Sequence, residues 1–167
     1  KEDTTYKMNK RLLSFRYLVY TSILITAIDQ GTKFWAFNNL SAHKSIIAIP
    51  HLLQFRLVKN TGAAFSILSG STTFLSFISL IVAISIILLL WKTEPIRIWK
   101  GMGLALILGG TLGNGVDRFR LGYVNDFLEL LPINFPIFNI ADISINIGII
   151  LFLIDISNNH NASKNLK

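Results

Sequence analysis

Four long apolar runs, separated by polar segments, limit how this chain of 167 residues can fold. The runs cover residues 17–37, 74–91, 99–117 and 137–154. A helix needs about 20 mostly apolar residues to cross a hydrocarbon core of about 30 Å. Only 15% of the residues are charged, whereas an average soluble protein has about 25%. The sequence therefore predicts an all-α polytopic membrane protein, built as a single domain with four transmembrane helices.

The distribution of basic residues predicts the orientation of these spans. Four spans place both termini on one side, which holds ten of the sixteen Lys and Arg residues; five lie on the other side, and Lys33 lies within the first run. Cytoplasmic segments of membrane proteins carry the excess of Lys and Arg. We therefore expect both termini in the cytoplasm. Membrane topology then explains the net charge of +7, and we expect no nucleic-acid partner.

The start of the chain also has features of a secretory signal peptide, because a basic segment precedes the first apolar run. The run continues through Asp29 to Lys33 into further apolar residues and contains no small-residue cleavage site. We therefore expect an uncleaved span.

The two outer connections, residues 38–73 and 118–136, are long for simple linkers. Apolar and polar residues alternate from Leu53 to Lys59, which predicts a half-buried strand on the membrane surface. Asn60, Thr61 and Gly62 follow as a predicted turn. We expect a small extracytoplasmic subdomain of strand and loop there, and a disordered polar tail over residues 157–167.

Several chemistries are disfavoured by composition. The chain has no cysteine, which excludes disulfides and thiol catalysis. Its three histidines, His43, His51 and His160, lie in predicted loops or the tail, and no second histidine or carboxylate stands at metal-ligand spacing. No phosphate-binding or dinucleotide-binding glycine motif is present. We expect neither a metal nor a cofactor.

Ionisable residues within a span are costly and therefore mark candidate functional sites. Asp29 and Lys33 stand four residues apart, on one face of the first predicted helix. Two interpretations remain open for this pair. It forms a salt bridge that anchors the outer end of the helix, or it faces the substrate.

A second polar group stands at the end of the third run, where Asn114, Asp117 and Arg118 share one helix face. The glycines at 109 and 113 suit close packing against another helix. Packing alone does not explain Asn114 and Asp117.

Asp126 and Asp142 are the most informative carboxylates. Asp142 lies about one turn inside the fourth predicted helix, and Asp126 lies in the preceding connection or at the end of the third helix. Pro132 and Pro136 interrupt any helix between them, so the chain turns back there. The return can bring both carboxyls together, and two adjacent carboxyls divide into one acid and one base. The alternative is that Asp142 caps its helix and Asp126 is a solvated loop residue.

Five segments together resemble the ordered motifs of one family. They are Asp29-Gln-Gly-Thr-Lys33, Lys59-Asn-Thr-Gly-Ala-Ala-Phe-Ser66, Gly113-Asn-Gly-Val-Asp-Arg118, Val124-Asn-Asp-Phe127 and Phe138-Asn-Ile-Ala-Asp142. The sequence resembles the lipoprotein signal peptidases, also called signal peptidase II, from about Asp29 to Ile147. One departure is Asn125, where the family more often carries an apolar residue.

This resemblance implies an intramembrane aspartic endopeptidase of the bacterial inner membrane, with its active site at the extracytoplasmic face. It implies that the enzyme cleaves prolipoproteins just before their diacylglyceryl-modified cysteine, in contact with membrane lipid. It also implies inhibition by globomycin-type peptides and no metal. Asp126 and Asp142 match the catalytic positions. The positions that match substrate-binding or supporting residues are Asp29, Lys33, Asn60, Gly62, Ala63, Asn114, Asp117, Arg118, Asn139 and Ala141.

Two other classes of membrane protein, a transporter and a structural subunit, are alternatives to the enzyme. A small proton-coupled or ion-coupled transporter also uses intramembrane carboxylates. A conduction path needs polar groups across the whole bilayer, yet the polar motifs here gather at one edge. A purely structural subunit would not require five polar motifs facing one place. The sequence therefore favours the enzyme.

Overall fold

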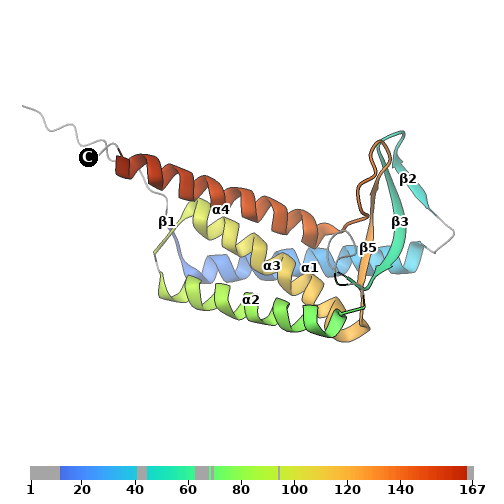
Figure 1. Cartoon of the computed structure of the whole chain (residues 1–167), viewed down its shortest axis with the longest axis horizontal. Helices are drawn as coiled ribbons and strands as arrows, with labels where there is room; N and C mark the ends of the chain where they lie inside the picture. Colours follow the sequence, from blue (N-terminus) through green and yellow to red (C-terminus); the bar gives the residue numbers. More distant parts are fainter. Residues whose placement is uncertain (1–11, 41–44, 63–67, 69, 94, 165–167) are drawn as a thin grey trace, which may run out of the picture.

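The computed structural model describes residues 12–40, 45–62, 68, 70–93 and 95–164 (Figure 1). The described residues form four long helices and two small antiparallel sheets. The helices are α1 (Phe15–Asn39), α2 (Thr72–Lys92), α3 (Ile98–Leu121) and α4 (Ile140–Lys164). Helices α1, α2 and α3 each contain one of the apolar runs, and α4 contains the fourth from Ile140 onward. The protein is therefore helix-rich with a small β subdomain, as predicted.

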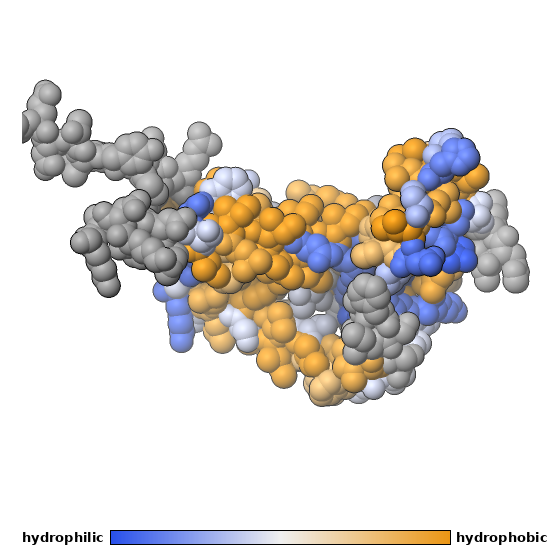
Figure 2. Space-filling model, turned by 45° about the horizontal axis from the view of Figure 1, so that its top comes forward, coloured by the Kyte–Doolittle hydropathy of each residue, from blue (hydrophilic) through white to orange (hydrophobic). Residues whose placement is uncertain are grey.

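Two helices satisfy length and composition criteria for a membrane span, namely Thr72–Lys92 and Ile140–Asn159. Large apolar side chains on these helices are exposed, including Ile81 and Leu153. Figure 2 shows that hydrophobic residues cover much of the surface along the helices. Exposed apolar surface of this extent is costly in water and suits a lipid environment. Helices α1 and α3 carry more polar residues, many of them on the sides where the helices face each other.

Helix α3 packs against each of the other three helices, and α2 packs mainly on α3. A ladder of hydrogen bonds joins α1 to α3, in which Ser22 Oγ, Thr26 Oγ1 and Gln30 Nε2 each donate to a backbone carbonyl. The acceptors are the carbonyls of Ala105, Gly109 and Gly113, also spaced by four residues. The matched spacing means that α1 and α3 run parallel, one helical turn per rung.

Two glycines allow the close approach of α1 to α3. A Cβ atom at Gly109 would lie 2.8 Å from the Ser22 carbonyl oxygen, and one at Gly113 would lie 2.5 Å from Asp29 Oδ2. A side chain at position 109 would therefore force the helices apart, and one at position 113 would displace the Asp29 carboxylate. The packing role predicted for these glycines is confirmed.

The larger sheet contains β2 (Ile46–Ile49), β3 (Leu53–Asn60) and β5 (Val124–Leu130), in the order β2-β3-β5. We call the end of the helices next to this sheet the sheet end (Figure 1). Strand β3 confirms the strand predicted from Leu53 to Lys59. The prediction for the second connection was incomplete, because α3 continues to Leu121 and β5 then pairs with β3.

The boundaries of α4 also differ from the sequence prediction. The helix begins at Ile140 because Phe138 is extended and exchanges backbone hydrogen bonds with Leu128 of β5. It then continues to Lys164, through most of the tail that we expected to be disordered. Extending an existing helix is far easier than starting one, which explains why polar residues can continue it.

At the opposite end, β1 (Leu12–Leu13) pairs with β4 (Ile96–Arg97). Arg97 Nη2 lies 2.6 Å from Asp155 Oδ2, and the Asp155 side chain is buried. This ion pair fastens α4 to the segment between α2 and α3.

Candidate active site

Asp126 and Asp142 reach the same cavity from two different elements. Asp126 lies in β5, opposite Val58 of β3, and is buried. Asp142 lies in the first turn of α4 and is half-buried. The placement of Asp126 in a strand corrects the expectation of a loop or helix-end position.

Asn139 links the two carboxylates, because its side-chain amide contacts Asp126 and its backbone N–H contacts Asp142. Its Nδ2 donates to Asp126 Oδ1 at 2.7 Å, and its backbone N–H donates to Asp142 Oδ2 at 3.1 Å. Asn139 Oδ1 accepts a hydrogen bond from the Asp142 backbone N–H at 3.0 Å. This reciprocal pattern is a capping box at the start of α4. Asp142 therefore does cap its helix, as one sequence interpretation proposed, while also facing the cavity.

The remaining carboxylate oxygens accept hydrogen bonds from two other amides. Asn60 Nδ2 donates to Asp126 Oδ2 at 2.9 Å, and Asn114 Nδ2 donates to Asp142 Oδ1 at 2.8 Å. Each of the four oxygens thus receives one N–H. Such donors fix the orientation of both carboxyls.

The orientation of the Asn114 side-chain amide is determined by two hydrogen-bond donors that contact its oxygen. Lys33 Nζ and Asn139 Nδ2 donate to Asn114 Oδ1 at 2.9 and 3.0 Å. The NH₂ group must then point the other way, toward Asp142. Lys33 thereby influences Asp142 through one intervening side chain.

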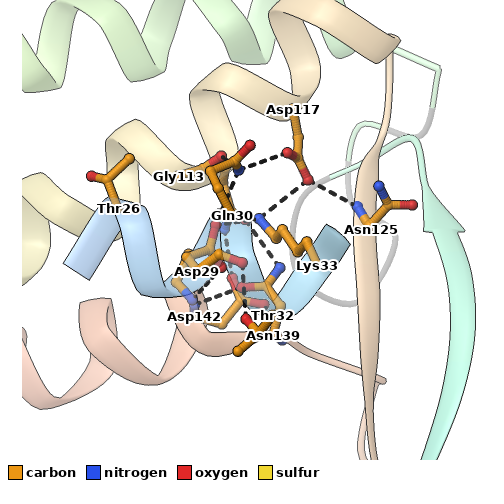
Figure 3. A network of polar contacts seen from close by, with 12 residues as sticks. Thr26, Asp29, Gln30, Thr32, Lys33, Gly113, Asp117, Asn125, Asn139 and Asp142 are labelled. Atoms are coloured by element: carbon orange, nitrogen blue, oxygen red, sulfur yellow. Dashed lines mark hydrogen bonds and ion pairs between the residues drawn. The ribbon is translucent and has the colours of Figure 1, made fainter. Parts of the chain in front are cut away.

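Lys33 is the centre of a buried ionic network (Figure 3). Its Nζ lies 2.8 Å from Asp29 Oδ2 and 3.2 Å from Asp117 Oδ2, and all three side chains are almost fully buried. The helical salt bridge that the sequence left open as one interpretation is therefore present.

The acidic members of this network also connect separate elements. Asp29 Oδ1 accepts the Ala141 backbone N–H at 2.9 Å, which ties α1 to the first turn of α4. Asp117 Oδ2 accepts the Asn125 backbone N–H at 3.1 Å, which ties α3 to β5. The network thus fixes the two segments that carry Asp126 and Asp142.

The turn after β3 completes one side of the site. Gly62 N–H donates to Asn60 Oδ1 at 2.9 Å, and Arg118 Nη2 donates to the Gly62 carbonyl at 3.2 Å. The predicted turn thus links Asn60 to the end of α3. Ala63, the remaining predicted support residue, lies outside the described residues.

A cavity of about 560 Å³ contains both carboxyls, and we call it the carboxylate cavity. Asn60, Asn114 and Arg118 line it beside the two aspartates, and Ile143, Ile147 and Ile150 of α4 form an apolar wall. An extended apolar segment placed there would contact both carboxyls. Among the described residues, no three histidine or acidic side chains gather at a spacing that suits a metal ion.

The environment of Asp126 favours its protonated form. Burial, followed by the negative charge of Asp142, raises the pKa of Asp126 from 3.8 to about 7, against the opposing effect of hydrogen bonds from Asn60 and Asn139. Asp142 lies at the start of α4, where the helix dipole favours a negative charge. The two carboxyls therefore have different environments, which suits a division into acid and base.

Sequence reasoning missed Gln30, although it lies within a motif that we quoted. Its Nε2 donates to Asp117 Oδ1 at 2.8 Å and to the Gly113 carbonyl at 3.1 Å. The spacing of Ser22, Thr26 and Gln30, each four residues apart in an apolar run, is the signal that would have found it.

Comparison with known proteins agrees with this geometry. A family model described as signal peptidase (SPase) II matches residues 21–158. The chain belongs to the signal peptidase II family. The match covers all five motif segments quoted from the sequence, from Asp29 to Asp142.

Individual relatives and a solved structure support membership of the signal peptidase II family. A lipoprotein signal peptidase of Parasynechococcus marenigrum is 47% identical over 145 residues, covering 84% of this chain and 89% of the relative. One of Enterococcus faecalis is 40% identical over 154 residues, covering 92% and 94%. A bacterial membrane enzyme solved by the in meso method aligns with a TM-score of 0.82 and 33% identity, covering 87% of this chain and 90% of that structure. The fold and the family thus agree.

Proposed function

We propose that this protein is an aspartic endopeptidase that removes signal peptides from prolipoproteins, cutting just before the diacylglyceryl-modified cysteine. The names of its relatives support the substrate class. The observation that carries the catalytic type is that Asp126 and Asp142 line one cavity and both hydrogen-bond to Asn139. The comparisons give no support to the transporter.

In the proposed mechanism, Asp126 is protonated and Asp142 is ionised. Asp142 accepts a proton from a water molecule as that water attacks the scissile carbonyl carbon. Asp126 donates a hydrogen bond to the carbonyl oxygen and stabilises the negative charge that develops there. Collapse of the tetrahedral intermediate breaks the C–N bond, and Asp142 gives the proton that it took from water to the leaving nitrogen, which restores the Asp142 carboxylate. The raised pKa of Asp126 supports its assignment as the acid.

We further propose that the protein spans the bacterial inner membrane four times, with both termini in the cytoplasm. The sheet end, where the polar side chains gather, then lies at the extracytoplasmic face (Figure 2). This placement exposes the carboxyls to water while the substrate's lipid remains in the bilayer. The orientation is tested by fusing to the C-terminus a reporter that is active only in the cytoplasm or one that is active only outside it. We expect activity from the first fusion and none from the second.

A cleavage assay in detergent tests the substrate class. The purified protein is mixed with one prolipoprotein in two forms, with and without the diacylglyceryl group, and the gel shift is followed. We expect cleavage of the lipidated form only, and its inhibition by a globomycin-type peptide. Equal cleavage of both forms would contradict the proposed substrate.

The rate should fall as the pH rises through about 7. Since the pKa of Asp126 is raised to about 7, its carboxyl holds the proton below that pH and loses it above. We expect kcat/KM to decrease by about tenfold per pH unit well above pH 7. The same proton stabilises the folded state at low pH, and this contribution is lost as pH rises through 7. The unfolding temperature is therefore measured at each pH, and a constant kcat/KM up to pH 9 in folded protein would refute the assignment.

Asn139 is expected to position both carboxyls, so its substitution should reduce activity more than stability. We expect Asn139→Ser to lower kcat by at least about 100-fold, since Ser retains a helix cap but cannot reach Asp126. The cap itself contributes only about 1 kcal/mol. Because the Asn139 hydrogen bond lowers the pKa of Asp126, the alkaline limb of the pH profile should also move to higher pH. A purely structural role would reduce the unfolding temperature and leave that limb in place.

A further inference from the structure

A second, larger cavity lies beside the carboxylate cavity, between α2 and α3. Its volume is about 790 Å³, and we call it the α2–α3 cavity. Its walls are apolar, and hydroxyl groups of α2 lie among them. The apolar lining includes Phe77, Leu80, Leu112, Val116 and Phe119, and the hydroxyls belong to Thr72, Thr73 and Ser76. The proposed mechanism does not use this cavity.

The two cavities share three lining residues, Ser79, Thr111 and Arg118. Helices α2 and α3 approach closely at this border, where a Cβ atom on Gly115 would lie 3.3 Å from Ser79 Cβ. The buried Nε of Arg118 has no hydrogen-bond partner among the described residues. The border therefore offers an unused N–H donor between an apolar cavity and the carboxyls.

The substrate class proposed above has a forked shape. The signal peptide is one apolar limb, and it contains the scissile carbonyl. The diacylglyceryl group is a second apolar limb, attached through the cysteine sulfur a few bonds away. Both limbs belong in the bilayer, so an enzyme that cuts between them needs two apolar grooves that meet near its catalytic groups.

We propose that the α2–α3 cavity binds the diacylglyceryl group of the substrate, while the carboxylate cavity binds the peptide limb. This inference rests on the proposed function. The peptide limb must touch the carboxyls because it holds the scissile bond, and only the carboxylate cavity contains them. The lipid limb branches off past Ser79, Thr111 and Arg118 into the α2–α3 cavity. The glyceryl ester carbonyls are acceptors that suit the hydroxyls and the Arg118 Nε there.

Partial filling of the α2–α3 cavity tests this assignment through acyl-chain length. Ser76 lines this cavity and not the carboxylate cavity, and among the described residues its Oγ donates a hydrogen bond to the Thr72 carbonyl of its own helix. For Ser76→Phe we expect kcat/KM to fall at least about tenfold for a dipalmitoyl substrate, mainly through KM. A dihexanoyl substrate, whose short chains still fit, should lose less than about threefold.

Two variants serve as controls. Ser85→Phe adds the same side chain to an exposed position deeper in α2, outside the lining of either cavity, and should leave both rates unchanged. Ile147→Phe fills the carboxylate cavity and should reduce both rates equally. An effect of Ser76→Phe that does not depend on chain length would overturn the assignment. So would a chain-length effect of Ile147→Phe, because it would place the lipid in the other cavity.

A labelling experiment tests the same assignment without the Ser76→Phe variant, in case that variant does not fold. An Asp142→Asn protein is incubated with a substrate that carries a photoreactive group in its acyl chain. Crosslinks should fall on residues 72–80 of α2 or 111–120 of α3, and crosslinks confined to α4 would refute the inference. If the unmutated protein cleaves no lipidated substrate, the proposed function fails; if it cleaves normally but either test fails, only the lipid assignment is wrong.

Discussion

Asp142→Asn is expected to reduce cleavage of a lipidated prolipoprotein by at least about 10³-fold. The amide cannot accept the proton of the attacking water, so the proposed base is lost. The fold should survive, because the amide oxygen can still accept one of the two hydrogen bonds that Asp142 receives. We expect a stability cost of about 1 kcal/mol. Activity is measured by gel shift and stability by thermal unfolding in the same detergent.

Asp155→Asn provides a matched control on the same helix. Asp155 is also buried and accepts a hydrogen bond, here from Arg97, but it lies several helical turns further along α4 than Asp142. This variant should lose stability and keep its rate at temperatures where it is folded. Equal loss of activity in both variants would mean that Asp142 acts through folding alone.

Lys33→Met is expected to cause the largest loss of stability among single substitutions in the network. Lys33 Nζ has three partners, Asp29, Asp117 and Asn114, and its side chain is 3% exposed. Removal of the cation leaves two carboxylates buried without it, which typically costs 3–5 kcal/mol, or a decrease in Tm of roughly 10 °C. Thermal unfolding measures the effect.

An exposed ion pair gives the comparison. Arg56 Nη2 lies 2.7 Å from Glu129 Oε1, but the Arg56 side chain is 47% exposed. Arg56→Met should therefore cost less than about 1 kcal/mol. The double variant Asp29→Asn with Lys33→Met should recover part of the lost stability, because one uncompensated charge is removed. If Lys33→Met unfolds at the same temperature as Arg56→Met, the buried network does not hold the site together.

The features that sequence predicted well depend on local patterns. The Asp29–Lys33 ion pair follows from helical spacing, and β3 follows from alternation of apolar and polar residues. Strand β5 has no such alternation, since residues 124–128 are all buried. A strand buried on both faces is difficult to distinguish from a loop or helix end by periodicity.

The links between elements were not predictable in the same way. Gln30 and Asp29 bind backbone groups of Gly113 and Ala141, and backbone groups have no signature in a sequence. The central position of Asn139 depends on Phe138 remaining extended beside β5, which is a tertiary contact. The resemblance identified these residues as motif positions, but only the structure explains how they hold one another.

The most direct test of the account is mass spectrometry of the products formed from a diacylglyceryl-modified prolipoprotein in ¹⁸O-labelled water. We predict one cut, with the lipidated cysteine at the new N-terminus and a single ¹⁸O atom in the new carboxyl of the signal peptide. Asp126→Asn and Asp142→Asn should give no product. A cut at another position, or normal product from either variant, would contradict the assignment of these two carboxyls as the catalytic pair.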